Sequence, residues 1–201
     1  SGGVAVSSRV LLCGALLLWA SGAGAGPLTD LLQARQAKID ALLARYPDPL
    51  PEAARRELQA AVGDLLDYGA MAEAALGAAE WQRRSAAQRE AFVAEFEALL
   101  RASSIRSVDV YRVSTVRYEQ ERVAGAAGEV RASVESDAAL TEMDYRFRRL
   151  DGRWRVVDYA IDGLWAAQNY QRQFQKVLAE HGWEELLERM RRRTAELEAE
   201  P

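Results

Sequence analysis

The hydrophobic period of this chain changes abruptly near Ser104, and that change limits the folds it can adopt. Before Ser104, apolar residues recur every three or four positions, which is typical of amphipathic helices. After it, "GEVRASVES" (128–136) and "EMDYRFRRL" (142–150) alternate apolar and polar residues, which is typical of half-buried antiparallel strands. From Trp165 the helical period returns. Helices and strands segregated in this order predict an α+β fold rather than a parallel α/β fold.

Helix boundaries can be predicted from local signals. The first helix is expected over 28–45, capped by Thr29 or Asp30, and ends at the proline-rich "YPDPLP". A second is expected from Pro51 to Leu65 or Leu66, and a short third over 71–76, ending at Gly77. Ser85 and Gln88 have the spacing of a capping box, which predicts the start of a fourth helix.

The strands are expected over 108–118, 128–136, 142–150 and 153–161. Asp151-Gly152 separates the last two, and this dipeptide predicts a tight hairpin. Two helices should follow, over 165–180 and 183–197, separated by His181-Gly182. The expected architecture is therefore a set of N-terminal helices, a cone-shaped, NTF2-like antiparallel sheet of about four strands, and two C-terminal helices packed over that sheet.

The N-terminus has the order of a secretory signal: Arg9, the apolar run "VLLCGALLLWA", then small residues up to Ala25. We expect residues 1–25 to be cleaved near Ala25, leaving a single exported domain over residues 26–201. The alternative is an uncleaved anchor, but a membrane span needs about 20 apolar residues. Cleavage would remove Cys13, the only cysteine, so neither disulfides nor thiol chemistry is expected.

Charge and composition exclude several classes of function. The formal net charge is −4, and losing Arg9 would make it one unit more negative, which disfavours nucleic-acid binding. His181 is the only histidine and precedes a glycine, so we expect it to end a helix rather than bind metal or catalyse. No glycine-rich phosphate loop follows a strand. We therefore predict no metal, no cofactor and no catalytic residue.

Two blocks then resemble the MlaC (toluene-tolerance) family of periplasmic phospholipid-binding proteins. The first is "DYGAMAEAALGAAEWQRRSAAQREAFVAEFEALL" (67–100), with its Met, Leu-Gly, Trp and Gln-Arg-x-x-Phe-x-x-x-Phe elements. The second is "YRFRRLDGRWRVVDYAIDGLWAAQNYQRQFQKVLAEHGWEELLERM" (145–190), with a strand–turn–strand, an acidic-Gly corner and an Asn-Tyr-x-x-Gln-Phe helix. The stretch 101–111 and Trp165, which stands where a small residue is common, depart from the family pattern.

The resemblance implies a shuttle that is not an enzyme. It would carry phospholipid between an outer-membrane lipoprotein/porin complex and an inner-membrane ABC transporter complex, and we expect it to be a monomer. The acyl chains are expected in an apolar cavity between the sheet and the helix that follows Gly163. The residues predicted to line this cavity are Phe92, Phe96, Leu100, Met143, Tyr145, Phe147, Val156, Ile161, Leu164, Trp165, Tyr170 and Phe174.

Two alternatives come from other classes of function. One is an exported NTF2-like enzyme that acts on a small apolar substrate, with Asp158, Tyr145 and Tyr159 as its acid–base groups. Asp158 is expected to share a strand face with Trp154 and Val156, although a structural role at the Asp162-Gly163 corner is favoured. The other alternative is a binding or assembly module with a fully packed core and no lipid.

Overall fold

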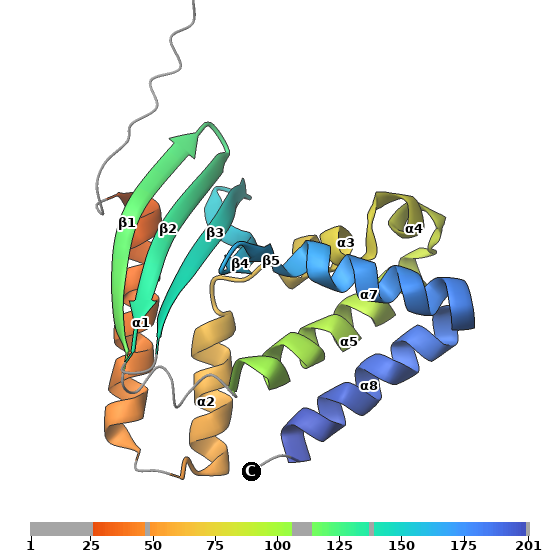
Figure 1. Ribbon diagram of the computed structural model, residues 1–201, viewed down its shortest axis with the longest axis horizontal. Coiled ribbons are helices and arrows are strands. Elements are labelled where there is room, and N and C mark those ends of the chain that lie inside the picture. Colours follow the sequence, from red (N-terminus) through yellow and green to blue (C-terminus); the bar gives the residue numbers. More distant parts are fainter. Residues whose placement is uncertain (1–25, 47–48, 106–113, 137–138, 200–201) are drawn as a thin grey trace, which may run out of the picture.

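The protein is described by a computed structural model that covers residues 26–46, 49–105, 114–136 and 139–199 (Figure 1). The predicted signal peptide over 1–25 and the first half of the first predicted strand, 108–113, lie outside these ranges. Seven helices are described: α1 (Pro27–Arg45), α2 (Glu52–Gly63), α3 (Tyr68–Leu76), α4 (Ala78–Arg83), α5 (Ala86–Ile105), α7 (Ala166–His181) and α8 (Trp183–Ala199).

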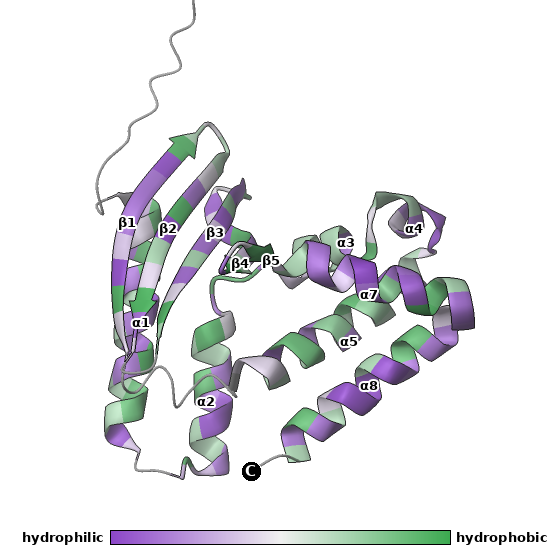
Figure 2. Cartoon of the chain, viewed as in Figure 1, coloured by the Kyte–Doolittle hydropathy of each residue, from purple (hydrophilic) through white to green (hydrophobic). Residues whose placement is uncertain are grey.

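The strands form one antiparallel sheet in chain order: β1 (Thr115–Ala124), β2 (Ala127–Glu135), β3 (Leu140–Leu150), β4 (Arg153–Ile161) and β5 (Leu164–Trp165). The predicted α+β class is confirmed, with five strands rather than about four. Figure 2 shows apolar and polar residues alternating along the long strands, whereas α3 is largely apolar.

The molecule has two parts that lie side by side (Figure 1). In the sheet half, α1 packs against one face of the sheet and α2 packs against α1. In the helical half, α7 packs on α3 and α8 packs on α5. Of the two C-terminal helices expected over the sheet, α7 contacts it through β4 and β5, while α8 packs on other helices. No helix of the described residues is both long and apolar enough to cross a membrane.

Two Asp-Gly dipeptides form the tight turns at the two ends of β4. Asp151 (φ 48°) and Gly152 (φ 78°) join β3 to β4 and confirm the predicted hairpin. Asp162 (φ 48°) and Gly163 (φ 77°) make the same kind of turn, so the chain pairs with β4 once more as β5 before α7 begins. Positive φ at both central residues suits the twist of a two-residue hairpin.

Carboxylates from the sheet cap two helices whose own N-cap residues make no side-chain cap. Glu121 on β1 accepts hydrogen bonds from the Leu28 and Thr29 amides and from the Thr29 hydroxyl, at 2.7–3.2 Å. Thr29 therefore lies inside α1 and donates to Glu121, and the prediction that Thr29 or Asp30 caps this helix is wrong. In contrast, the capping box of Ser85 and Gln88 is confirmed by its two reciprocal bonds, of 3.0 and 3.2 Å.

Candidate functional site

The face of the sheet that packs against α1 carries six of the predicted lipid-lining residues. The strand register pairs Met143 with Ile161 and Phe147 with Val156, and β5 pairs Leu164 with Ile161. Cross-strand partners share a face of the sheet, so these side chains point the same way. We call this the α1-facing surface, and it consists of Met143, Tyr145, Phe147, Val156, Ile161 and Leu164.

A β-bulge in β4 makes this surface continuous. Asp158 pairs with Arg146 while Val156 pairs with Phe147, so Val157 is an extra residue without a partner on β3. An extra residue shifts the alternation of side chains by one position. Val156 and Ile161 consequently share the α1-facing surface, while Asp158 lies on the opposite face. The prediction that Asp158 shares a face with Val156 is wrong for this reason.

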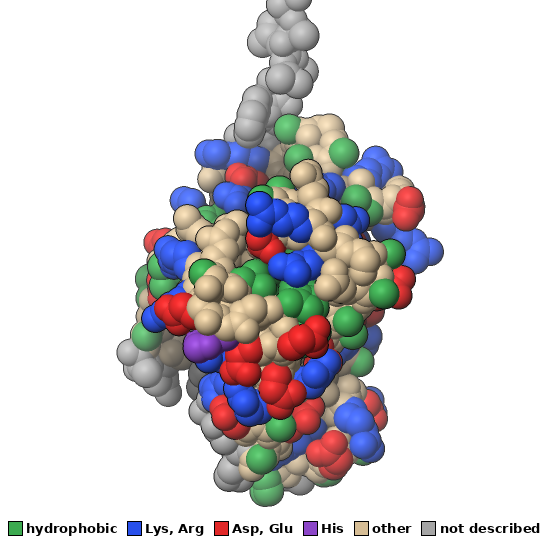
Figure 3. Space-filling view, turned by 90° about the vertical axis from the view of Figure 1, so that its right-hand side faces the viewer, with side chains coloured by type: hydrophobic (Ala, Val, Ile, Leu, Met, Phe, Trp, Pro, Cys, Tyr) green, Lys and Arg blue, Asp and Glu red, His purple; other side chains and the backbone are tan. Residues whose placement is uncertain are grey.

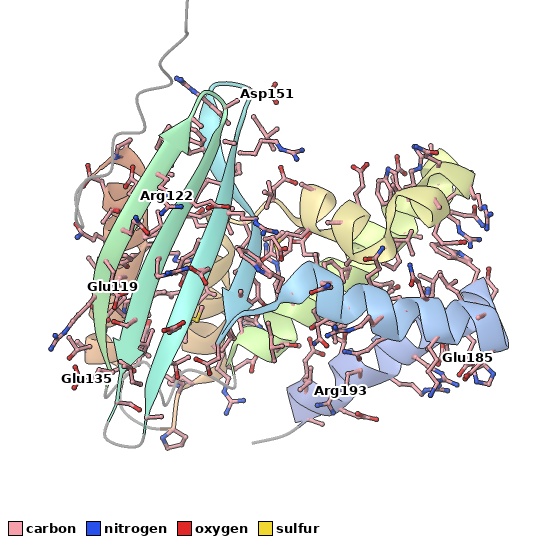
Figure 4. The ribbon with its side chains drawn as sticks, turned by 45° about the horizontal axis from the view of Figure 1, so that its top comes forward. Glu119, Arg122, Glu135, Asp151, Glu185 and Arg193 are labelled. Carbon is pink, nitrogen blue, oxygen red and sulfur yellow. The ribbon has the colours of Figure 1, made fainter. Side chains whose placement is uncertain are left out.

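Burial along the α1-facing surface is graded from one end of the sheet to the other. Near the Asp151 turn, Phe147 and Val156 are buried, with 2% and 0% of their surface exposed. Tyr145 and Met143 are partly buried, and at the other end Ile161 and Leu164 are 46% and 67% exposed. Figure 4 labels Asp151 at the first end and Glu135 at the second. The surface is therefore apolar throughout, but only one end of it is covered.

Helix α1 covers the closed end of this surface. Leu28 and Leu32 are fully buried against Val130, Phe147 and Val156, and a side chain at Gly128 would collide with Leu28. The segment after α2 also covers this end of the surface. Leu66 forms a parallel β-bridge with Val156, and the Val156 amide donates to the Leu65 carbonyl at 2.8 Å. Leu28 and Leu32 were not among the residues predicted to line the lipid cavity. Their spacing of one helical turn nevertheless indicates that both lie on one apolar face of α1.

Five further predicted residues belong to the core of the helical half instead. Phe92, Phe96, Leu100 and Phe174 are at most 5% exposed, and Tyr170 packs against them. The rings contact one another closely: the Phe96 and Tyr170 centroids lie 5.1 Å apart, and those of Phe92 and Phe174 lie 5.6 Å apart. Edge-to-face aromatic pairs at these distances are typical of a packed core.

A partly open cleft with both polar and apolar lining residues lies beside that aromatic core, between α5, α7 and α8. It has a volume of about 540 Å³ and includes Tyr170 and Phe174 among its lining residues. Burial raises the pKa of Tyr170, against the opposing effect of a hydrogen bond with Ser103. At the rim, Arg189 and Arg193 pair with Glu185 and Glu196 at 2.8 and 2.9 Å, so their charges are already compensated.

Trp165, the last predicted lining residue, lies away from both regions. It pairs with Ala160, which puts its side chain on the face of the sheet opposite the α1-facing surface. There the Arg146 guanidinium lies 3.5 Å from the centre of its ring, in a cation–π contact.

The three acid–base groups of the enzyme alternative do not converge. Asp158 is buried, and Oδ1 accepts the Tyr159 amide at 3.0 Å and the Ala167 amide at 3.1 Å, which caps α7. Burial raises the pKa of Asp158, while these two amides and Arg146 oppose the shift. Tyr145 and Tyr159 are cross-strand partners and share the α1-facing side of the sheet, whereas Asp158 lies on the opposite face; Tyr159 also packs against the helical core. Within the described ranges, no group of three or more His, Cys, Asp or Glu side chains could hold a metal ion.

Comparisons with known proteins agree with this fold. The family model described as "MlaC protein" matches residues 34–192. A solved structure of a phospholipid-binding protein from Ralstonia solanacearum, in complex with a phospholipid, superposes with a TM-score of 0.70 at 21% identity. The match covers 85% of this chain and 96% of that one. A search of curated proteins finds no match.

Proposed function

This chain belongs to the MlaC family, and from that premise we propose that it is a periplasmic phospholipid-binding shuttle. In this proposal residues 1–25 are removed as a signal peptide, and residues 26–201 form the lipid-binding domain. The observation that carries the proposal is the α1-facing surface, which is apolar along its whole length and uncovered at the end of Ile161 and Leu164. The similar fold of a protein solved with a bound phospholipid supports it.

A phospholipid that moves through water without a carrier faces a large free-energy cost, because its acyl chains are exposed. A diacyl lipid exposes on the order of 25–30 methylenes, and burying each is worth about 0.8 kcal/mol, so free passage through water costs roughly 20 kcal/mol. A carrier lowers this cost by covering the acyl chains and needs no acid–base group. In the proposal, the chains enter between Ile161 and Leu164, pass Met143 and Tyr145, and end near Phe147 and Val156.

The donor and acceptor of the lipid would be membrane complexes. Family membership supports an inner-membrane ABC transporter complex on one side and an outer-membrane lipoprotein/porin complex on the other, with the protein acting as a monomer between them. The position of Asp158 supports a binding protein over an enzyme, because its carboxylate is engaged in capping α7 on the face away from the α1-facing surface.

The proposal is tested by native mass spectrometry of the chain exported to a bacterial periplasm and purified without detergent. We expect an adduct of phospholipid mass that solvent extraction releases, and transfer of a fluorescent phospholipid between two vesicle populations. A bare protein that also takes up no lipid from vesicles would refute the proposal. A fully packed module without lipid would then account better for the fold.

A further inference from the structure

The end of the sheet at which the two long hairpins turn is strongly basic. Gly125-Ala126 joins β1 to β2 and Asp151-Gly152 joins β3 to β4. The Arg149 amide donates to the Ala126 carbonyl at 2.8 Å, so the two turns lie side by side. Figure 4 shows this end, labelled by Asp151, extending beyond the helices. We call it the hairpin end, and its arginines are Arg122, Arg148, Arg149, Arg153 and Arg155.

These arginines lack carboxylate partners. Among the described residues, no carboxylate lies within ion-pair distance of any of the five guanidinium groups. Arg149 donates to the Gly152 carbonyl at 3.3 Å and Arg155 to the Asp64 carbonyl at 2.6 Å, but these neutral acceptors leave the charge of each arginine uncompensated. The full chain has a formal net charge of −4, so the hairpin end is a local concentration of positive charge on an acidic protein.

Two of the arginines face each other across the sheet. The register pairs Arg148 of β3 with Arg155 of β4, and like charges directly opposite one another destabilise an antiparallel pair. On the other side of Arg148, β2 places the small and exposed Ala127, which leaves the guanidinium accessible. An anionic group bound at Arg148 and Arg155 would relieve their repulsion, so the hairpin end favours an anionic ligand.

The other end of the sheet has the opposite charge. There Arg117 is paired with Glu135 at 3.2 Å, and the exposed Glu142 and Asp162 add further negative charge. The exposed apolar side chains of the α1-facing surface lie at this acidic end. An acidic partner would therefore be attracted to the hairpin end and repelled from the end at which lipid is proposed to enter.

An acidic polypeptide fits the hairpin end better than a lipid bilayer does, although guanidinium groups bind both carboxylates and phosphates. Strand β4 has nine residues, so at about 3.3 Å per residue its Arg153 end lies roughly 25 Å from Ile161. A bilayer at the hairpin end would thus be far from the opening at Ile161 and Leu164. Moreover, none of the large apolar side chains that the described residues expose lies at the hairpin end, where it could insert into a membrane.

We propose that the hairpin end docks an acidic segment of a partner protein, whose carboxylates pair with the arginines. The partner holds the protein at the end opposite to Ile161 and Leu164, so phospholipid can enter and leave while the partner stays bound. Docking itself does not require lipid, but its role as a tether during lipid exchange rests on the proposed function.

The test measures binding of a fluorescein-labelled oligoglutamate peptide to the full chain by fluorescence anisotropy, at about 0.15 M salt. We expect the double variant Arg148→Gln/Arg153→Gln to weaken binding about tenfold, because two exposed ion pairs with the peptide are lost. This variant should unfold at or above the wild-type temperature, since the substitution removes the repulsion between Arg148 and Arg155. Phospholipid uptake from phosphatidylglycerol vesicles should stay at the wild-type level, with or without the peptide.

Arg189→Gln/Arg193→Gln is the matched control. It removes the same charge from two exposed arginines that already pair with Glu185 and Glu196, so it should leave peptide binding unchanged. Equal weakening in both double variants, or no peptide binding by the wild type, would overturn the inference.

Three further outcomes separate the inference from its rivals. Co-sedimentation with phosphatidylglycerol vesicles that requires Arg148 and Arg153, without peptide binding, would assign the hairpin end to a bilayer and overturn the protein partner. A bound peptide that blocks phospholipid uptake would overturn the role as a tether. A wild type that binds the peptide as expected but takes up no phospholipid would support docking and overturn the proposed function instead.

Discussion

The helical half and the sheet half of this molecule are filled in different ways. In the helical half, Phe92, Phe96 and Phe174 contact one another and are almost fully buried, so packing alone accounts for them. In the sheet half, apolar side chains at one end of the α1-facing surface stay in solvent. The outer end of the helical half bears intermixed acidic and basic side chains around a small hydrophobic area (Figure 3).

We interpret this difference as one between a packed scaffold and the proposed lipid site. Monomeric proteins rarely leave contiguous apolar surface uncovered unless something binds there. The three large apolar side chains that the described residues expose, Leu140, Ile161 and Leu164, all lie at the same end of the sheet. Recognition is therefore expected in the sheet half, and the aromatic residues of the helical half are expected to support the fold.

The largest effect should come from Phe96→Ala, which removes the ring at the centre of the aromatic core. Deleting a buried phenylalanine side chain typically costs about 3–5 kcal/mol, because the cavity left behind collapses only in part. Denaturant unfolding followed by circular dichroism should show a loss of this size in the free energy of unfolding. A loss of phospholipid from a variant that keeps wild-type stability would contradict the comparison, since it would put Phe96 in the binding site.

The next effect should appear in binding rather than in stability. Replacing both Ile161 and Leu164 by Asp puts charge at the open end of the α1-facing surface. Each lost apolar contact is worth about 1.5–3 kcal/mol when fully buried, so phospholipid occupancy should fall at least about tenfold. The free energy of unfolding should change little, because both side chains are exposed.

Leu140→Asp is the matched control for this double variant. Leu140 is 66% exposed at the same end of the sheet, but the register places it on the opposite face from Met143. We expect it to bind phospholipid as the wild type does, measured by native mass spectrometry after incubation with vesicles. An equal loss of phospholipid binding in both variants would show that the α1-facing surface contributes no more to binding than the opposite face of the sheet.

The sequence predicts the helices and the long strands, because their signals are local. The capping box at Ser85 and the hairpin at Asp151-Gly152 are examples in which a few residues decide the conformation. The same hairpin signal occurs at Asp162-Gly163 and could have predicted β5. The helical period resumes so soon after Asp162-Gly163 that the pattern predicts a strand-to-helix corner in place of a further strand.

The site was less predictable, since it depends on tertiary pairing. Simple alternation along β4 puts Asp158 with Val156, and only the bulge at Val157 separates them. Aromatic residues such as Phe92 are equally apolar in a core and in a cavity, so composition could not assign them to the helical half.

A smaller effect is expected at the boundary between the two halves, where Asp158 of β4 caps α7. Burial raises the pKa of Asp158 in the folded state, so its ionisation disfavours folding. Its stabilising contribution is complete below the unfolded pKa of about 4 and is lost as the pH rises through the folded value. Asp158→Asn removes this titration and can still accept the Ala167 amide.

We therefore expect wild type to lose stability relative to Asp158→Asn as the pH rises from about 4 to 7. Denaturant unfolding at both pH values measures this difference. Phospholipid binding should be unaffected, because Asp158 lies on the face away from the α1-facing surface. Loss of binding in Asp158→Asn would favour the enzyme-like alternative, with a carboxyl group inside the site.

The smallest effect should come from the surface of the helical half, at Glu185 on α8 (Figure 4). Hydrogen bonds from Arg189 and Arg192, at 2.8 and 3.0 Å, lower the pKa of Glu185. Its contribution to stability is thus present above the unfolded pKa and is lost as the pH falls through the folded value. Water and salt screen these ion pairs, so Glu185→Gln should lower the melting temperature only slightly, and not at all in high salt. A loss as large as that of Phe96→Ala would mean that ion pairs, rather than the aromatic core, stabilise the helical half. The contrast between a half stabilised by packing and a half left open for a ligand would then fail.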